Sequence, residues 1–166
     1  MNEMKPLFDG LKLNCTIVSD THLDIKHPTP ELPQSRFINV LKEDKKSEAP
    51  VDALVIVGDT TSRGMRHNWD LFRDCFTEET TGCAKQLLLQ LGNHDTWHDV
   101  SYDAAICEYY SAVKELCGFT LDRVYYSKEI NGYRFIFLGS EEEGGCGANI
   151  SDRQADWLDK ELKCGT

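Results

Sequence analysis

Blocks of apolar residues alternate with blocks of mixed apolar and polar residues along the chain, which predicts strands separated by helices. Three blocks are nearly continuous apolar runs containing branched residues, as expected of strands buried on both faces of a parallel sheet. They lie at 11–20, 51–59 and 85–93. In four other blocks, apolar residues recur every three or four positions, which predicts amphipathic helices. These lie at 35–46, 69–76, 106–116 and 151–162.

The remaining segments read as turns, loops and one hairpin. Residues 21–33 contain three prolines and are expected to form a loop. Residues 123–140 should form two strands joined at Asn131-Gly132, a strong hairpin signal. An acidic loop follows, and Ser151 and Gln154 then have the spacing of a helix capping box. Strands that alternate with helices predict an α/β fold with mostly parallel pairing.

Size and charge narrow the class of protein. A chain of 166 residues predicts a single domain. Its net charge of −10 argues against nucleic acid as a partner, because no basic surface is visible. The charge does not exclude an anionic substrate, since a bound metal ion can supply positive charge locally. The seven cysteines are dispersed, without a C-x-x-C pair, and are expected to be mostly reduced core residues.

The sequence predicts a cytoplasmic protein with no membrane segment. It contains no run of about 18 apolar residues, the length at which a membrane-spanning helix becomes the favoured interpretation. The N-terminal residues lack the basic and apolar regions of a secretory signal.

Each of the three predicted parallel strands is followed directly by polar residues. These read "SDTH" at 19–22, "GDTT" at 58–61 and "GNHD" at 92–95. The carboxyl ends of parallel strands open onto one edge of the sheet, where ligands bind. We therefore expect a set of oxygen and imidazole groups to converge there, and such a set suits Mn, Fe, Zn or a similar divalent ion. Its members are Asp20, His22, Asp59, Asn93 and His94.

The spacing within these segments supports a metal site. In an extended segment, Asp20 and His22 would point to the same side. Asp59 follows the middle of the three blocks and could bridge two ions, and a pair of ions about 3.5–4 Å apart is the usual clamp for phosphoester hydrolysis. Taken singly, each polar residue is explained as a turn former or a helix cap. Their joint occurrence, each directly after an apolar strand, favours the metal site.

The segments "DTH", "GDTTSRG" and "GNHD" closely resemble the first three blocks of the calcineurin-like metallophosphoesterase superfamily. The segment "SDRQADWLDKEL" is similar to the Gln-x-x-Trp-Leu helix of many bacterial members. The resemblance implies the N-terminal portion of a two-sheet α/β/β/α sandwich with mostly parallel or mixed strands. It also implies a metal-dependent phosphoesterase that hydrolyses a small phosphomonoester or phosphodiester through attack by a metal-bound hydroxide.

The same resemblance implies a role for each site residue. Asp20 and His22 would bind the first of two divalent ions (Mn, Fe, Zn or Ni), and Asp59 would bridge both. Asn93 would bind the second ion, and His94 would protonate the leaving oxygen or stabilise the transition state. Asp95 is expected to orient the imidazole of His94, and Arg63 to donate to the phosphate.

Two departures from the family pattern change the expectation. Ser62 stands where the phosphoprotein phosphatases carry an Asp, which favours a bacterial-type phosphodiesterase or phosphomonoesterase. No histidine follows Ser140, whereas the family completes its site with three further histidines. We therefore expect residues 1–166 to be one metallophosphoesterase domain that lacks its C-terminal end, with an incomplete second metal site.

Two other interpretations remain open: a non-catalytic scaffold of the same fold, and a nuclease of the same superfamily. The presence of His94 favours an enzyme, and the acidic composition argues against a nuclease. Outside the site, His27, His67 and His98 are expected in solvated loops, as is the acidic run at 141–143. Trp69 and Trp157 are expected in the core, and Trp97 either packs simply or lines a substrate pocket. The oligomeric state is not indicated.

Overall fold

The computed structural model describes residues 13–29, 31–46, 50–97, 100–142 and 147–164. At its centre is a parallel sheet in the order β1-β2-β3, which confirms the predicted parallel α/β arrangement. The strands are β1 (Cys15–Val18), β2 (Ala53–Val57) and β3 (Leu87–Gln90). Each is shorter than the predicted apolar run and ends before the polar residues that follow it.

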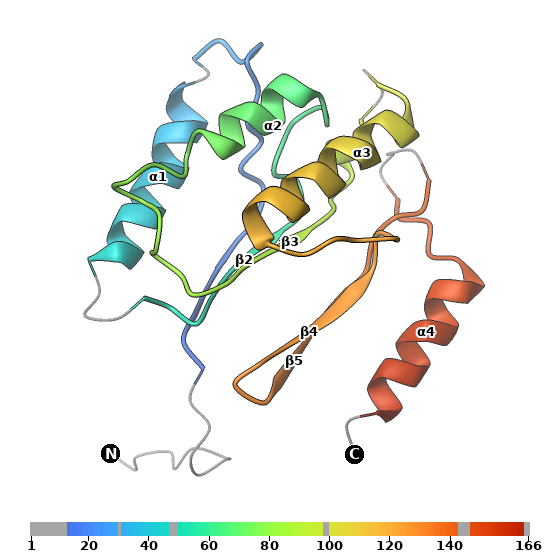
Figure 1. The fold of residues 1–166 in the computed structure, drawn as a ribbon. Helices are drawn as coiled ribbons and strands as arrows, with labels where there is room; N and C mark the ends of the chain where they lie inside the picture. The colour runs from blue at the N-terminus through green and yellow to red at the C-terminus, as the bar shows by residue number, and fades with distance from the viewer. Residues whose placement is uncertain (1–12, 30, 47–49, 98–99, 143–146, 165–166) are drawn as a thin grey trace, which may run out of the picture.

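Three helices cover one face of this sheet (Figure 1). They are α1 (Glu31–Lys45), α2 (Arg66–Arg73) and α3 (Tyr102–Ala112), and a π-helical turn, η2 (Val113–Cys117), continues α3. The core between the layers is formed by buried apolar side chains of the sheet and of the helices. It includes Leu54, Ile56, Leu89, Phe37, Leu41, Trp69, Phe72 and Tyr109.

Helix α1 begins earlier than the sequence predicted. Residues 31–33 were expected to belong to a proline-containing loop, but α1 starts at Glu31 and includes Pro33. The first four N–H groups of a helix have no partner within the helix, so a proline costs little in its first turn. Proline therefore did not exclude helix at this position.

A β-hairpin packs on the opposite face of the parallel sheet. Its strands are β4 (Tyr126–Ile130) and β5 (Tyr133–Phe137), joined at Asn131 and Gly132 with φ of 51° and 81°. Two consecutive positive φ angles are the conformation that Asn-Gly hairpins favour, so the predicted hairpin is confirmed. Its buried residues contact the sheet through a second apolar cluster. That cluster contains Ala53, Val55, Leu88, Tyr126, Ile130 and Phe137.

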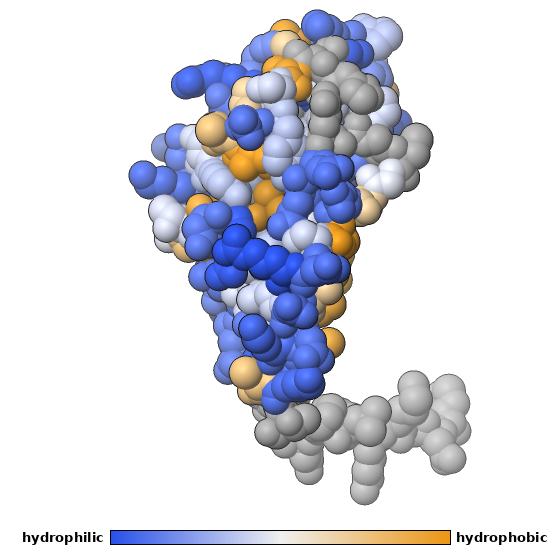
Figure 2. Space-filling model, turned by 90° about the vertical axis from the view of Figure 1, so that its right-hand side faces the viewer, coloured by the Kyte–Doolittle hydropathy of each residue, from blue (hydrophilic) through white to orange (hydrophobic). Residues whose placement is uncertain are grey.

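Helix α4 (Asp152–Lys163) forms the outer layer, on the side of the hairpin away from the parallel sheet (right in Figure 1). The rings of Trp157 and Tyr125 lie 4.9 Å apart, and the Arg134 guanidinium donates to the carbonyl of Glu161. The order is thus helices, sheet, hairpin and helix, as expected of an α/β/β/α sandwich. Seen from the side of α4, the surface is mainly hydrophilic, with some apolar side chains showing in its upper half (Figure 2).

The predicted capping box at the start of α4 is only half formed. The Ser151 hydroxyl accepts from the N–H of Gln154, as expected. The Gln154 side chain, however, is fully buried and pairs with both the N–H and the carbonyl of Gly139. The N–H of Ser151 donates instead to the carboxylate of Glu141. Glu141 is therefore anchored to α4 rather than solvated as predicted.

The six cysteines in the described part of the chain are free, and Cys146 lies outside it. Cys75 and Cys83 are buried, as predicted for core residues, whereas Cys107 and Cys164 are exposed. Burial raises the pKa of the Cys75 thiol to about 12. Among the described helices, none combines the length and the apolar character needed to cross a membrane.

Candidate metal centre

The segments that follow β1 and β2 run side by side beyond the ends of the strands. The N–H of Asp20 donates to the carbonyl of Gly58 at 3.3 Å, and the N–H of His22 donates to the carbonyl of Asp59 at 3.0 Å. The segment after β3 joins them, because the N–H of His94 donates to Asp59 Oδ1 at 2.9 Å. The polar residues that follow all three strands therefore meet at one edge of the sheet, as the sequence predicted.

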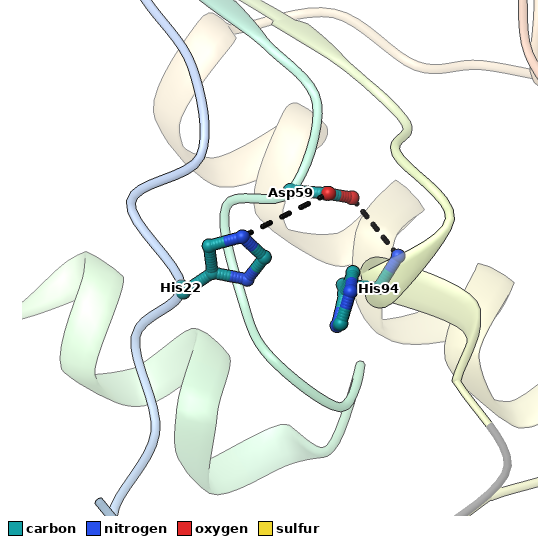
Figure 3. A group of neighbouring side chains, drawn as sticks. All are labelled: His22, Asp59 and His94. Carbon is teal, nitrogen blue, oxygen red and sulfur yellow. Dashed lines mark hydrogen bonds and ion pairs between the residues drawn. The ribbon is translucent and has the colours of Figure 1, made fainter. Parts of the chain in front are cut away.

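His22, Asp59 and His94 form the group best placed to hold a metal ion (Figure 3). One ligand atom from each lies within 4.8 Å of the others. Asp59 lies beside the two imidazoles, whose ring centroids are 4.6 Å apart, with its Oδ2 3.9 Å from His22 Nε2. Asp20 lies beside this group, with Oδ1 3.6 Å from His22 Nε2, and its side chain is 66% exposed.

The backbone at these residues adopts a conformation that side chains other than glycine rarely take. Asp20, His22 and Asp59 have φ of 56°, 44° and 50°. The extended conformation expected for Asp20 and His22 is therefore wrong, and their side chains meet through left-handed backbone instead. Such residues cost free energy and persist where the surrounding structure holds them, which is common at functional sites.

Gly92 allows the close approach of Asp59. A Cβ at Gly92 would lie 2.1 Å from the backbone N of Asp59 and 2.2 Å from its Oδ1. No side chain fits there unless Asp59 moves. Gly58, which precedes Asp59, has φ of +76°. Gly92 thus makes room for a site carboxylate, as only a residue without a Cβ can.

The sequence suggested that Asp95 orients the imidazole of His94, but the carboxylate of Asp95 contacts other groups. Its carboxylate is fully buried and accepts from the N–H groups of Thr60, Thr61 and Gly92 and from the Thr61 hydroxyl. It therefore ties the segment after β2 to the segment after β3. Burial raises the pKa of Asp95 to about 6, against the opposing effect of the hydrogen bonds from Thr61 and Gly92.

The imidazole of His94 is positioned by other groups. Its Nδ1 lies 3.3 Å from the carbonyl oxygen of Ser62. A carbonyl only accepts, so this contact places the proton on Nδ1 and leaves Nε2 with the lone pair. The ring stacks on Trp97 and meets the ring of His22 edge to face. Ser62, which the sequence marked only as a departure, thus helps to orient His94 through its backbone.

Comparison with known proteins identifies the family. A family model described as calcineurin-like phosphoesterase matches residues 13–161, from just before β1 into α4. The chain belongs to the calcineurin-like phosphoesterase family. The match confirms the resemblance seen in the sequence, and it spans the three strand ends that meet at the metal centre.

The chain is also similar to individual known proteins. A probable cyclic nucleotide phosphodiesterase of Rhodococcus erythropolis is 29% identical over 147 residues, which are 87% of this chain and 46% of that protein. The chain thus spans about half the length of this relative. A purple acid phosphatase from yellow lupin (Lupinus luteus) seeds superposes with a TM-score of 0.55 over 91% of this chain and 27% of its own. At 15% identity, this likeness shows a shared fold.

Arg63 of this calcineurin-like phosphoesterase is anchored by a residue that the sequence analysis did not single out. Its Nε donates to Asp24 Oδ2 at 3.0 Å, and Asp24 is only 6% exposed. Burial alone would raise the pKa of Asp24, but hydrogen bonds from the Lys26 N–H and from Arg63 lower it overall. Asp24 lies two residues after His22, and no local pattern links it to Arg63, which is 39 residues away along the chain.

Two cavities flank the metal centre. One of about 360 Å³ is lined by Asp20, His22 and Ser62 on the site side and by α1, including Arg36 and Phe37, on the other. The other, of about 480 Å³, is lined by Asn93 and Gly92 and by residues after β5. Asn93, predicted as a metal ligand, therefore lies at the same edge of the sheet and faces this second cavity.

The remaining predicted residues fall outside the group. His27 is exposed and lines the first cavity, in agreement with a loop histidine. His67 lies on α2 rather than in a loop, and its Nε2 is buried, with no hydrogen-bond partner among the described residues. His98 is outside the described residues. Trp69 is fully buried, as predicted, and Trp157 is partly buried against Tyr125.

Proposed function

We propose that the chain belongs to a metal-dependent phosphoric ester hydrolase acting on a small phosphodiester or phosphomonoester. The observation that carries the proposal is the group of His22, Asp59 and His94 at the ligand-binding edge of the sheet, with His22 and Asp59 on strained backbone. Membership of the calcineurin-like phosphoesterase family supports the reaction class. The relative described as a probable cyclic nucleotide phosphodiesterase supports a phosphodiester as substrate.

The donors in this group fit a divalent cation. Two imidazoles and a carboxylate, without a thiolate, suit Mn, Fe, Zn or Ni. We propose His22 and Asp59 as ligands, with Asp20 beside the first ion and Asn93 beside a second, so that Asp59 would lie between the two. When bound, such ions supply Lewis acidity that polarises the phosphoryl oxygen and lowers the pKa of a bound water.

The chain's own residues would prepare the phosphate and its leaving group. Arg63, anchored by Asp24, would donate to phosphate oxygens. The Nδ1 proton of His94 is held at the Ser62 carbonyl, so Nε2 is the free ring nitrogen. Nε2 can either bind a cation through its lone pair or carry a proton for the leaving oxygen. We propose the second use, in which protonated His94 donates from Nε2 to the departing oxygen.

The proposal is tested by changing the aspartates at the two ends of β2. Asp59→Asn keeps the shape of the side chain but weakens a central ligand, whereas Asp52→Asn makes the same change at the far end of the strand. Mn²⁺ binding is measured by calorimetry, and hydrolysis of p-nitrophenyl phosphate and bis(p-nitrophenyl) phosphate by absorbance. We expect Asp59→Asn to lower Mn²⁺-dependent hydrolysis by on the order of 100-fold or more, and Asp52→Asn to retain it.

Three results would contradict the proposal. If the wild-type protein does not bind Mn²⁺, the proposed metal centre is wrong. Binding of Mn²⁺ without hydrolysis of either ester would instead favour the non-catalytic scaffold. Preference for a nucleic-acid strand over both small esters would point to the nuclease.

A further inference from the structure

Trp97 makes a close ring contact at the metal centre that the proposed function does not use. It follows η1 (His94–Thr96), one turn of 3₁₀ helix, and its backbone N–H donates to the backbone carbonyl of His94 at 3.3 Å. This turn brings the indole back over the imidazole of His94. The two ring centroids lie 4.5 Å apart and the planes differ by only 4°. The contact is a parallel stack rather than an incidental edge contact.

The other contacts of His94 hold the residue at its edges and its backbone. Ser62 fixes Nδ1 at 3.3 Å, Asp59 accepts from the backbone N–H, and the ring of His22 meets His94 at 4.6 Å and 87°. Rotation of an imidazole about its last side-chain torsion is otherwise broad. The flat face of Trp97 restricts this rotation, because turning the imidazole out of plane would break the stack.

We infer that Trp97 is a positioning residue for His94, and that its indole holds the imidazole in the orientation that groups it with His22 and Asp59. This inference rests on the proposed metal centre. Fixing the ring before substrate binds removes part of the entropy cost of ordering it, which favours proton donation from Nε2 to the leaving oxygen. The stack needs a flat aromatic face, so phenylalanine should replace tryptophan in it and alanine should not.

The stack also makes Trp97 an optical reporter of the centre. A paramagnetic ion quenches a tryptophan strongly only at short range, and Trp97 touches a residue of the candidate site. Trp157 lies on α4, in the outer layer, against Tyr125 at 4.9 Å, and Trp69 is fully buried on α2. Trp157 is the matched control, because it too is partly buried and packed on an aromatic ring.

The test compares wild type, Trp97→Phe, Trp97→Ala and Trp157→Phe, using Mn²⁺ as the ligand. By calorimetry we expect all four proteins to bind Mn²⁺ within about 2-fold of one another. In Mn²⁺-dependent hydrolysis of phenyl phosphate, whose leaving oxygen needs a proton, we expect Trp97→Phe to keep kcat within about 2-fold of wild type and Trp97→Ala to lower it by about 5- to 10-fold, the size of a lost aromatic stack. We expect Mn²⁺ to quench tryptophan fluorescence in wild type and Trp157→Phe, and the quenching to disappear in Trp97→Phe.

The outcomes separate this inference from the proposed function. If Trp97→Ala hydrolyses phenyl phosphate as fast as wild type, or if Trp97→Phe keeps the quenching, Trp97 does not position His94 at the centre although the centre exists. If wild type binds no Mn²⁺, the proposed function fails and the inference with it. Circular dichroism checks that each variant is folded. Should Trp97→Ala be unfolded, the fluorescence of Trp97→Phe still decides.

Discussion

Single residues set the geometry of the candidate metal centre through the backbone as much as through side chains. Asp59 has left-handed backbone and lies against Gly92, where a Cβ would be 2.1 Å from its nitrogen. The carboxylate can therefore occupy this position only because Gly92, 33 positions further along the chain, has no side chain. The position of the ligand depends on Gly92 as directly as on Asp59 itself.

Gly92→Ala should disrupt the centre, because its methyl group would overlap both the backbone and the carboxylate of Asp59. We expect a loss of about 2–4 kcal/mol in the free energy of unfolding and a loss of Mn²⁺ binding. Denaturant unfolding and calorimetry measure the two effects. Gly82→Ala is the control, because no atom lies within 4 Å of the added carbon; Gly82 has positive φ, at +83°, whereas Gly92 does not.

The control should cost about 1 kcal/mol through backbone strain alone and leave Mn²⁺ binding intact. Equal effects of the two substitutions on Mn²⁺ binding would show that the contact with Asp59 does not explain the role of Gly92.

At the scale of elements, polar side chains tie the ends of strands together. Asp52, just before β2, accepts from the N–H of Asn14 before β1 and from the ammonium of Lys85 before β3. Its carboxylate thus links the starts of all three parallel strands. The hydrogen bond from Asn14 and then the one from Lys85 lower the pKa of Asp52 from 3.8 to about 2.

This link predicts a dependence of stability on pH. The folded-state pKa lies below the unfolded value, so Asp52 stabilises the fold above about pH 4, and this contribution is lost as the pH falls toward 2. Asp52→Asn should lower the free energy of unfolding near neutral pH, and its difference from wild type should shrink over that interval. Denaturant unfolding at a series of pH values measures the difference.

Lys85→Met should retain part of this pH dependence, because the bond from the Asn14 N–H remains. The difference in the free energy of unfolding between wild type and Asp52→Asn could instead stay constant from pH 7 to about pH 2. This would show that Asp52 titrates alike in the folded and unfolded chains.

Across the whole molecule, the two faces of the parallel sheet are covered to different extents. Helices α1 to α3 bury Leu54 and Ile56 completely. The hairpin covers Val55 and Leu88 on the other face, but Ile17 on β1 stays 63% exposed. The sheet therefore has one fully packed face and one face packed mainly over β2 and β3.

Truncating isoleucines on the two faces should have unequal effects. Ile56→Ala leaves a cavity among packed side chains and should lower the free energy of unfolding by about 2–4 kcal/mol, whereas Ile17→Ala should cost about 1 kcal/mol or less. Denaturant unfolding of both variants measures the difference. Similar losses would mean that Ile17 is covered in solution, by another copy or another segment.

Much of the fold could be predicted from the hydrophobic pattern, because strands and helices must bury one face or both. The apolar runs located all three parallel strands, and Asn131-Gly132 located the hairpin. The errors lie at helix starts. Helix α1 begins at Glu31 and α2 at Arg66, ahead of their apolar stripes, because the first turn of a helix is often polar and tolerates proline.

The candidate site was predicted as a set of residues but not as a geometry. Asp20, His22, Asp59, Asn93 and His94 do reach one edge of the sheet, while their roles remain predictions. Asp24, which anchors Arg63, and the backbone of Ser62, which orients His94, carried no distinct sequence signal. Their partners lie more than 30 positions away along the chain, and local spacing does not reveal such pairs.

The sequence by itself determined which residues end each strand, since an apolar run must stop where polar groups begin. It therefore determined that carboxylate, amide and imidazole groups gather at one edge of a parallel sheet. Only the tertiary structure decided how they meet: left-handed backbone at Asp20, His22 and Asp59, room left by Gly92, and His94 stacked on Trp97. These features depend on contacts between segments distant in the chain, and periodicity along a chain cannot encode them.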